Sequence, residues 1–166
     1  MISWVRAPSV SRVTYAPKSR VKLDNSNTNM EAAKAIRYGD AEALRYNEHQ
    51  ILYEVENRLI DYCTDHEDYM TFWIACYRDR EVATEMFEVF MDTCSTAFRL
   101  EKYEEIMELY ANATMIGAIS AENFEILDYI KGYVTKKDIY DELYAQHGDQ
   151  EDWPMSLLKW YDENFS

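Results

Sequence analysis

The chain is poor in glycine and proline, with four glycines and three prolines among 166 residues. Two of the prolines, Pro8 and Pro17, fall within the first 20 residues, so almost none are left for the body of the chain. Sheets with several strands need frequent Gly, Pro or Asn turns between the strands. The scarcity of these residues excludes such a sheet and predicts an all-α body.

Cysteine and long apolar segments are also scarce. No apolar run approaches the roughly 18 residues that a membrane span requires, and the N-terminus lacks the continuous apolar stretch of a secretory signal. The three cysteines, Cys63, Cys76 and Cys94, are odd in number and show no paired spacing. Unpaired, scattered cysteines are typical of a reducing compartment, so we expect a cytoplasmic protein.

Basic residues are few relative to acidic ones: 17 Lys and Arg face 31 Asp and Glu, giving a formal net charge of -14. A protein that binds nucleic acid needs excess cations to displace phosphate counterions, and one that binds anionic lipid needs them as well. We therefore expect no direct nucleic-acid binding and no membrane binding. The hydrophobic fraction of 48% and the aromatic fraction of 14% exclude wholesale disorder and fit one domain.

Charge is divided unevenly along the chain. Residues 1–22 carry five basic residues and no acid, so the remainder holds 12 basic and 31 acidic residues. This division predicts a basic N-terminal arm and linker over residues 1–28 and an acidic helical domain over residues 29–166. The arm is either extended or a short strand pair. A basic arm suits contact with carboxylates of its own or a neighbouring chain. An acid-free start also resembles a mitochondrial transit peptide, although Pro8 and Pro17 interrupt any long helix there.

Capping residues and apolar periodicity predict about eight helices, packed as a compact bundle or a short irregular repeat stack. The segment Tyr69 to Tyr77 is apolar almost all round, so we expect it at the centre of the core. The other predicted helices are Met30 to Tyr38 between Asn29 and Gly39, a long helix from Ala41 to Cys63 capped by Asp40, Arg80 to Phe98, one containing Tyr103 to Ala113, one capped by Ser120 and reaching Val134, one from Thr135 to Gly148, and Trp153 to Phe165.

A short phrase recurs at four junctions between predicted helices. Asp40, Asp79, Asn123 and Asp149 are each followed by one residue and then Glu, at separations of 39, 44 and 26 residues. The phrase resembles the helix-turn-helix junction of ankyrin repeats, although the period is irregular and the Thr-Pro-Leu-His tetrapeptide of that family is missing. The resemblance implies a scaffold that binds proteins.

Patterns for catalysis and metal binding are weak. None of the three histidines, His49, His66 and His147, forms a pair of ligands on one helical face with a Glu or a second His. Cys63 and His66 form one Cys-x-x-His without a second pair, and no glycine-rich phosphate loop occurs. We therefore predict a non-enzyme without metal or cofactor. An enzyme built on His66 and scattered carboxylates would require a deep pocket lined by them.

Acidic residues follow helical spacing in three places, and these are the predicted partner-binding residues. Like charges at such spacing each cost a few tenths of a kcal/mol, so the rows are either a solubilising face or a binding surface. The rows are Glu81, Glu85, Glu88 and Asp92, then Glu101, Glu104, Glu105 and Glu108, and finally Asp138, Asp141 and Glu142.

A row of carboxylates on a helix has the spacing needed to imitate phosphates. Seven helical residues advance about 10 Å, close to three phosphate steps of about 3.4 Å along one DNA strand. Fourteen tyrosines, many of them beside acids, would add contact area at low entropy cost.

These features predict a non-catalytic inhibitor that occupies a basic, nucleic-acid-binding surface of a partner protein such as a nuclease. In type it is similar to the small acidic DNA mimics that phages and mobile elements make against restriction or CRISPR enzymes. The alternative is an ankyrin-like adaptor that binds a specific protein or peptide, with charge serving solubility only. Either function is compatible with a homodimer.

Overall fold

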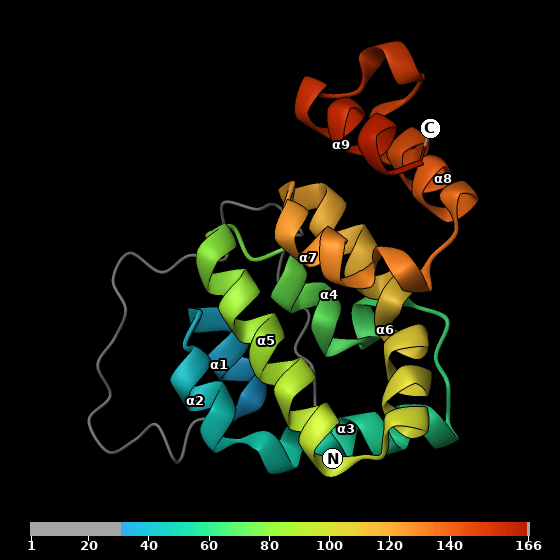
Figure 1. The fold of residues 1–166 in the computed structure, drawn as a ribbon. Coiled ribbons are helices and arrows are strands. Elements are labelled where there is room, and N and C mark those ends of the chain that lie inside the picture. The colour runs from blue at the N-terminus through green and yellow to red at the C-terminus, as the bar shows by residue number, and fades with distance from the viewer. Residues whose placement is uncertain (1–30, 166) are drawn as a thin grey trace.

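The computed structural model describes residues 31–165, which form nine α-helices and three short 3-10 helices and contain no strand (Figure 1). This confirms the predicted all-α class. The helices are α1 (Ala32–Tyr38), α2 (Ala41–Tyr46), α3 (Glu48–Ile60), η3 (His66–Asp68), α4 (Met70–Ala75), α5 (Arg80–Ala97), α6 (Leu100–Ala121), α7 (Phe124–Ile130), η4 (Lys131–Tyr133), α8 (Lys136–His147), η5 (Gln150–Asp152) and α9 (Met155–Phe165).

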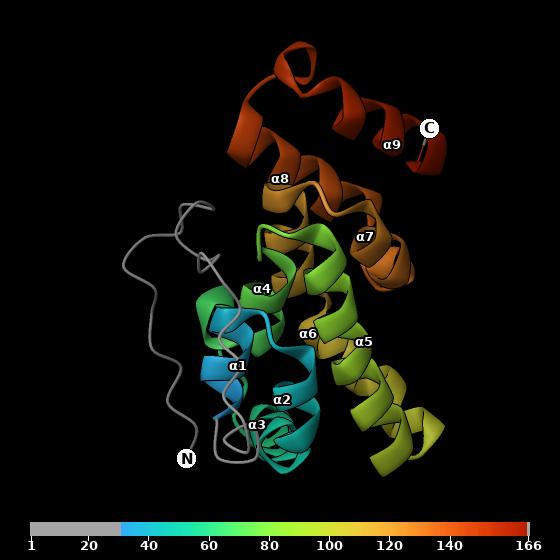
Figure 2. The same cartoon turned by 90° about the vertical axis from the view of Figure 1, so that its left-hand side faces the viewer.

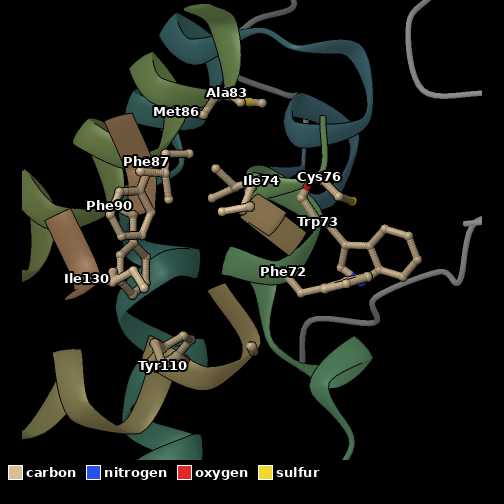
Figure 3. Close-up of a cluster of buried hydrophobic side chains, with 14 of the residues drawn as sticks. Phe72, Trp73, Ile74, Cys76, Ala83, Met86, Phe87, Phe90, Tyr110 and Ile130 are labelled. Carbon is tan, nitrogen blue, oxygen red and sulfur yellow. Dashed lines mark hydrogen bonds between the residues drawn. The ribbon is translucent and has the colours of Figure 1, made fainter. Parts of the chain in front are cut away.

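The short helix α4 lies at the centre of the core, as its uniformly apolar sequence predicts. All six of its residues are buried, and it packs against α6, α5 and α1 (Figure 3). Gly117 permits the closest approach between α6 and α4, because a Cβ atom at this position would lie 2.6 Å from the carbonyl oxygen of Phe72. The contact between these two helices therefore depends on the absence of a side chain at residue 117.

The long helices α5 and α6 carry the apolar faces that enclose α4. The rings of Phe87 and Phe90 are stacked with centroids 6.0 Å apart, and the ring of Phe90 lies 5.0 Å from that of Tyr110 on α6. The amphipathic spacing of α5 directs its acids to the opposite, exposed side. The core thus fixes which faces of α5 and α6 meet solvent.

Helices α8 and α9 lie next to α7 at one end of the molecule (Figure 2). Aromatic contacts hold this end together: the Trp153 ring lies 5.3 Å from Tyr140 and 5.4 Å from Tyr161. The indole nitrogen of Trp160 donates to Asp128 at 3.0 Å, which joins α9 to α7. The aromatic residues predicted for the last helix therefore form its packing surface.

Several predicted helix boundaries are confirmed by their caps. Gly39 ends α1 in the left-handed conformation with φ 67°, and the Asp40 carboxylate accepts from the backbone N–H of Ala43 at 3.0 Å. Thr135 and Asp138 form a reciprocal capping box at the start of α8, which ends at Gly148. Local sequence chemistry is sufficient to set these ends.

Several predicted boundaries are wrong. The last helix begins at Met155 rather than at Trp153. The expected single helix from Ala41 to Cys63 is divided between α2 and α3 at Asn47, whose buried side-chain amide donates to the carbonyl oxygen of Ala43 at 2.8 Å. Ser120 lies inside α6 rather than capping the next helix. The cap is Asn123, whose side chain accepts from the N–H of Ile126 at 3.0 Å. Helix α7 then ends at Ile130, short of Val134.

The predicted basic arm over residues 1–28, and Asn29, lie outside the described residues. Within residues 31–165, no helix is both long enough and apolar enough to cross a membrane.

Candidate functional site

The eleven predicted acids all reach the surface: Asp138 and Glu142 are half-buried and the other nine are exposed. Among the described residues, eight of the eleven have no Lys or Arg within ion-pair distance, and three do. Those three pairs are Asp92 with Arg45 at 3.2 Å, Glu105 with Lys102 at 3.1 Å and Asp141 with Lys137 at 2.6 Å. Most of the predicted negative charge is therefore not neutralised within the described part of the chain.

Tyrosine hydroxyls hold two of these acids in place. Tyr129 of α7 donates to Glu88 of α5 at 2.7 Å, and its pKa is raised, first because the hydrogen bond favours the neutral phenol and second because of burial. Tyr133 of η4 donates to Glu104 of α6 at 2.8 Å, and burial together with Glu104 raises the pKa of Tyr133 to about 12. Both tyrosines are therefore neutral hydrogen-bond donors to these two acids.

The two tyrosine–acid pairs belong to one surface, which we name the acid–tyrosine face. A shallow groove of about 460 Å³ between α2, α5, α6 and α7 contains Tyr129, Tyr103 and Arg45, the ion-pair partner of Asp92. Tyr103 is also an electrostatic neighbour of Tyr133. The face therefore runs from the α5 row to the α6 row. It comprises Glu88, Asp92, Tyr103, Glu104, Tyr129 and Tyr133.

A second, deeper hollow of about 350 Å³ lies between α6, the loop 61–69 and the start of α8, and we name it the α6–α8 cleft. It brings together Glu108 of the second predicted row and Asp138 of the third. Its lining combines polar side chains with aliphatic ones. The lining residues are Tyr62, Cys63, Thr64, His66, Tyr69, Glu108, Leu109, Asn112, Ala113, Ile116, Tyr133, Val134 and Asp138.

A buried polar network supports the wall of this cleft. The carboxylate of Glu54, 2% exposed, accepts from Arg58 Nε at 3.1 Å and from the Tyr110 hydroxyl at 3.3 Å. The same guanidinium donates through Nη1 to the sulfur of Cys63 at 3.0 Å, and the Tyr69 hydroxyl donates to the Cys63 carbonyl at 2.6 Å. Arg58 thus joins α3 to the loop that borders the cleft.

The cleft contains the residues that an enzyme based on His66 would need, but without a hydrogen-bonded catalytic pair. The His66 ring meets the edge of Phe72 at a centroid distance of 4.7 Å. Within residues 31–165, it makes no hydrogen bond to Cys63, Glu108 or Asp138. A nucleophile and its base normally lie within hydrogen-bond reach. No group of three or more potential metal ligands occurs within residues 31–165.

The structure does not bring all the predicted residues together. Six of them line neither the groove nor the cleft: Glu142 is half-buried, and the exposed ones are Glu81, Glu85, Glu101, Glu105 and Asp141. Sequence reasoning missed Tyr62, Asn112 and Tyr133 as lining residues. Only Asn112 carried a signal, because it follows Glu108 by four residues on the same helical face.

Comparison with known proteins places the chain in a family. A family of unknown function, DUF5903, matches residues 31–162, which is nearly the whole described domain. The chain belongs to this family. No curated protein matches the chain, and no solved structure does. The DUF5903 match therefore covers the groove and the cleft alike, without assigning a function to either.

Proposed function

We propose that this DUF5903 protein is a non-catalytic, cytoplasmic inhibitor that binds a basic, nucleic-acid-binding surface of a partner protein through the acid–tyrosine face and the adjoining α5 row. The partner class is a nuclease or another nucleic-acid-binding protein. In type the activity is that of the small acidic DNA mimics that phages use against host defence enzymes.

The observation that supports this proposal is the combination of uncompensated charge and fixed position. Eight of the eleven predicted acids have no Lys or Arg partner among the described residues, and two of them are held by tyrosine hydroxyls from a different helix. A solubilising face needs charge but no fixed geometry. Carboxylates held beside tyrosine rings suit the arginine side chains that are common in protein interfaces.

The dimensions of the α5 row fit the comparison with a phosphate row. Glu81 and Asp92 are eleven residues apart on one helix, which corresponds to about 16 Å along its axis. Five phosphate steps on one DNA strand cover about 17 Å. The α5 row and a short stretch of DNA backbone would therefore compete for the same basic side chains on the partner protein.

A displacement experiment tests the proposal. The chain is titrated into complexes of labelled DNA with each of a panel of purified restriction and CRISPR nucleases, and DNA release is followed by fluorescence anisotropy. We expect release from at least one nuclease, lost on replacing Glu81, Glu85 and Glu88 by Gln and Asp92 by Asn. The matched control replaces four exposed acids elsewhere, Glu48, Glu56, Asp149 and Glu151, by their amides. Equal loss in both variants would indicate a net-charge effect and contradict a specific surface.

The second candidate function is an ankyrin-like adaptor, and the capping geometry favours it locally. Asp40 and Asn123 each accept from a backbone N–H three residues on, and Asp79 accepts from the N–H groups of Glu81 and Val82 at 3.1 and 3.2 Å. Three of the four recurring phrases thus form similar turns. For an adaptor, partner affinity would be insensitive to salt and to the α5 substitutions, and sensitive to changes near the Asp79 and Asn123 turns.

A further inference from the structure

The α6–α8 cleft has the size and shape of a site for a small ligand. Its volume of about 350 Å³ lies at the lower end of the range of about 300–1,000 Å³ that is typical of ligand pockets. The aliphatic part of its lining comes from α6 and from the segment before α8, namely Leu109, Ala113, Ile116 and Val134. Such a lining suits an alkyl chain rather than a fully polar molecule.

The carboxylates of the cleft give it a mainly acidic lining. Glu108 and Asp138 line it together with one histidine, His66, and no Lys or Arg is among the lining residues. The guanidinium of Arg58 does not line the cleft and is engaged by Glu54 and Cys63. An anionic ligand would meet repulsion from both carboxylates without a compensating Lys or Arg, whereas a cation would meet attraction from them.

Tyrosine rings add to the preference for a cation. Tyr62, Tyr69 and Tyr133 line the cleft, and the hydroxyls of the last two are committed to the Cys63 carbonyl and to Glu104. What Tyr69 and Tyr133 offer a ligand is therefore mainly ring surface, which attracts guanidinium and ammonium groups. The side-chain oxygen of Asn112 provides a further acceptor.

We infer that the α6–α8 cleft binds an alkyl cation, with a guanidinium or ammonium head attracted by Glu108 and Asp138 and its alkyl stem against the aliphatic lining residues. The ligand is either a free alkylguanidine or alkylamine, or the side chain of an arginine or lysine carried by a polypeptide. The inference does not depend on the proposed function, because the cleft contains no residue of the α5 row and shares only Tyr133 with the acid–tyrosine face.

The inference is tested by titrating the full ¹⁵N-labelled chain with n-butylguanidinium and following amide chemical shifts. We expect saturable shifts in residues 61–69, 108–116 and 133–138. The neutral isostere n-butylurea is expected to bind at least tenfold more weakly, a factor that corresponds to about 1.4 kcal/mol. A parallel titration with N-acetylarginine methylamide distinguishes the two sources: binding of both ligands supports a peptide-borne arginine, and binding of butylguanidinium alone supports a free cation.

Two variants locate the head group. Glu108→Gln and Asp138→Asn are each expected to weaken butylguanidinium binding by about fivefold. Glu101→Gln, which removes an exposed carboxylate of α6 outside the cleft, serves as the matched control and should leave the affinity unchanged. Equal binding of butylurea, unsaturable shifts, or equal weakening by Glu101→Gln would overturn the inference. None of these results would decide whether the chain displaces DNA from a nuclease.

Discussion

Replacement of Arg58 by Met tests the network behind the cleft most stringently. The guanidinium forms the ion pair with Glu54, whose side chain is 2% exposed, and its own side chain is 18% exposed. Burial lowers the pKa of Arg58 while Glu54 raises it, and the net change is upward. The Glu54 carboxylate is thus sufficiently removed from water that loss of the Arg58 guanidinium beside it is costly.

The expected loss is about 3–5 kcal/mol in the free energy of unfolding, which is typical when one partner of a buried ion pair is removed. With a urea m-value of about 2 kcal/mol/M for a small domain, the unfolding midpoint should fall by about 2 M. The double variant Arg58→Met with Glu54→Gln should recover more than half of the loss, because it removes the buried charge as well as its partner.

The assay is urea unfolding of the full chain, followed by far-UV circular dichroism. Arg78→Met is the matched control, because Arg78 is exposed in the loop between α4 and α5, and it should change stability by no more than about 0.5 kcal/mol. A loss below about 1 kcal/mol for Arg58→Met, or no recovery in the double variant, would refute the account of this network.

Three further predictions concern packing, pH and thiol reactivity. Gly117→Ala should lower the free energy of unfolding by about 1–3 kcal/mol in the same urea assay, because the new Cβ would meet a backbone oxygen of α4. An unchanged stability would contradict the close contact between α6 and α4. Stability should fall as pH rises from 10 toward 12, because the folded chain, in which the pKa of Tyr133 is about 12, holds the phenol proton more tightly than the unfolded chain. Thermal melting over this pH range measures the fall, and Tyr133→Phe should make it smaller. A thiol reagent at pH 8 should label half-buried Cys63 before the buried Cys76 and Cys94, and mass spectrometry reads the order. Burial raises the pKa of Cys94 to about 12, so early labelling of Cys94 would contradict this prediction.

The elements with strong local signals could be predicted from the sequence. The central position of α4 follows from a segment that is apolar on every side, and the ends of α1 and α8 follow from Gly39 and Thr135. The division between α2 and α3 could not be predicted, since it depends on the Asn47 amide turning back to a backbone oxygen inside the core. Without knowledge of that hydrogen bond, the spacing of the apolar residues predicts one continuous amphipathic helix.

The candidate site divides in the same way. Helical spacing predicts that Glu104 and Glu108 lie on one face of α6, and both are exposed there. Their neighbours depend on long-range packing: Asp138 joins Glu108 only because α8 returns across α6, and Tyr133 reaches Glu104 only because a 3-10 turn follows α7. The residue spacing within a single helix cannot predict either of these contacts between helices.

The salt dependence of binding tests the central claim most directly. The dissociation constant for the nuclease identified by DNA displacement is measured between 50 mM and 300 mM salt, for the wild-type chain and for the variant with Glu81, Glu85, Glu88 and Asp92 replaced by amides. If carboxylates imitate phosphates, wild-type affinity falls steeply with salt, and the variant binds more weakly with a shallower dependence. A wild-type affinity that is indifferent to salt, or a variant with the same slope as the wild type, would contradict the proposed role of the acidic surface.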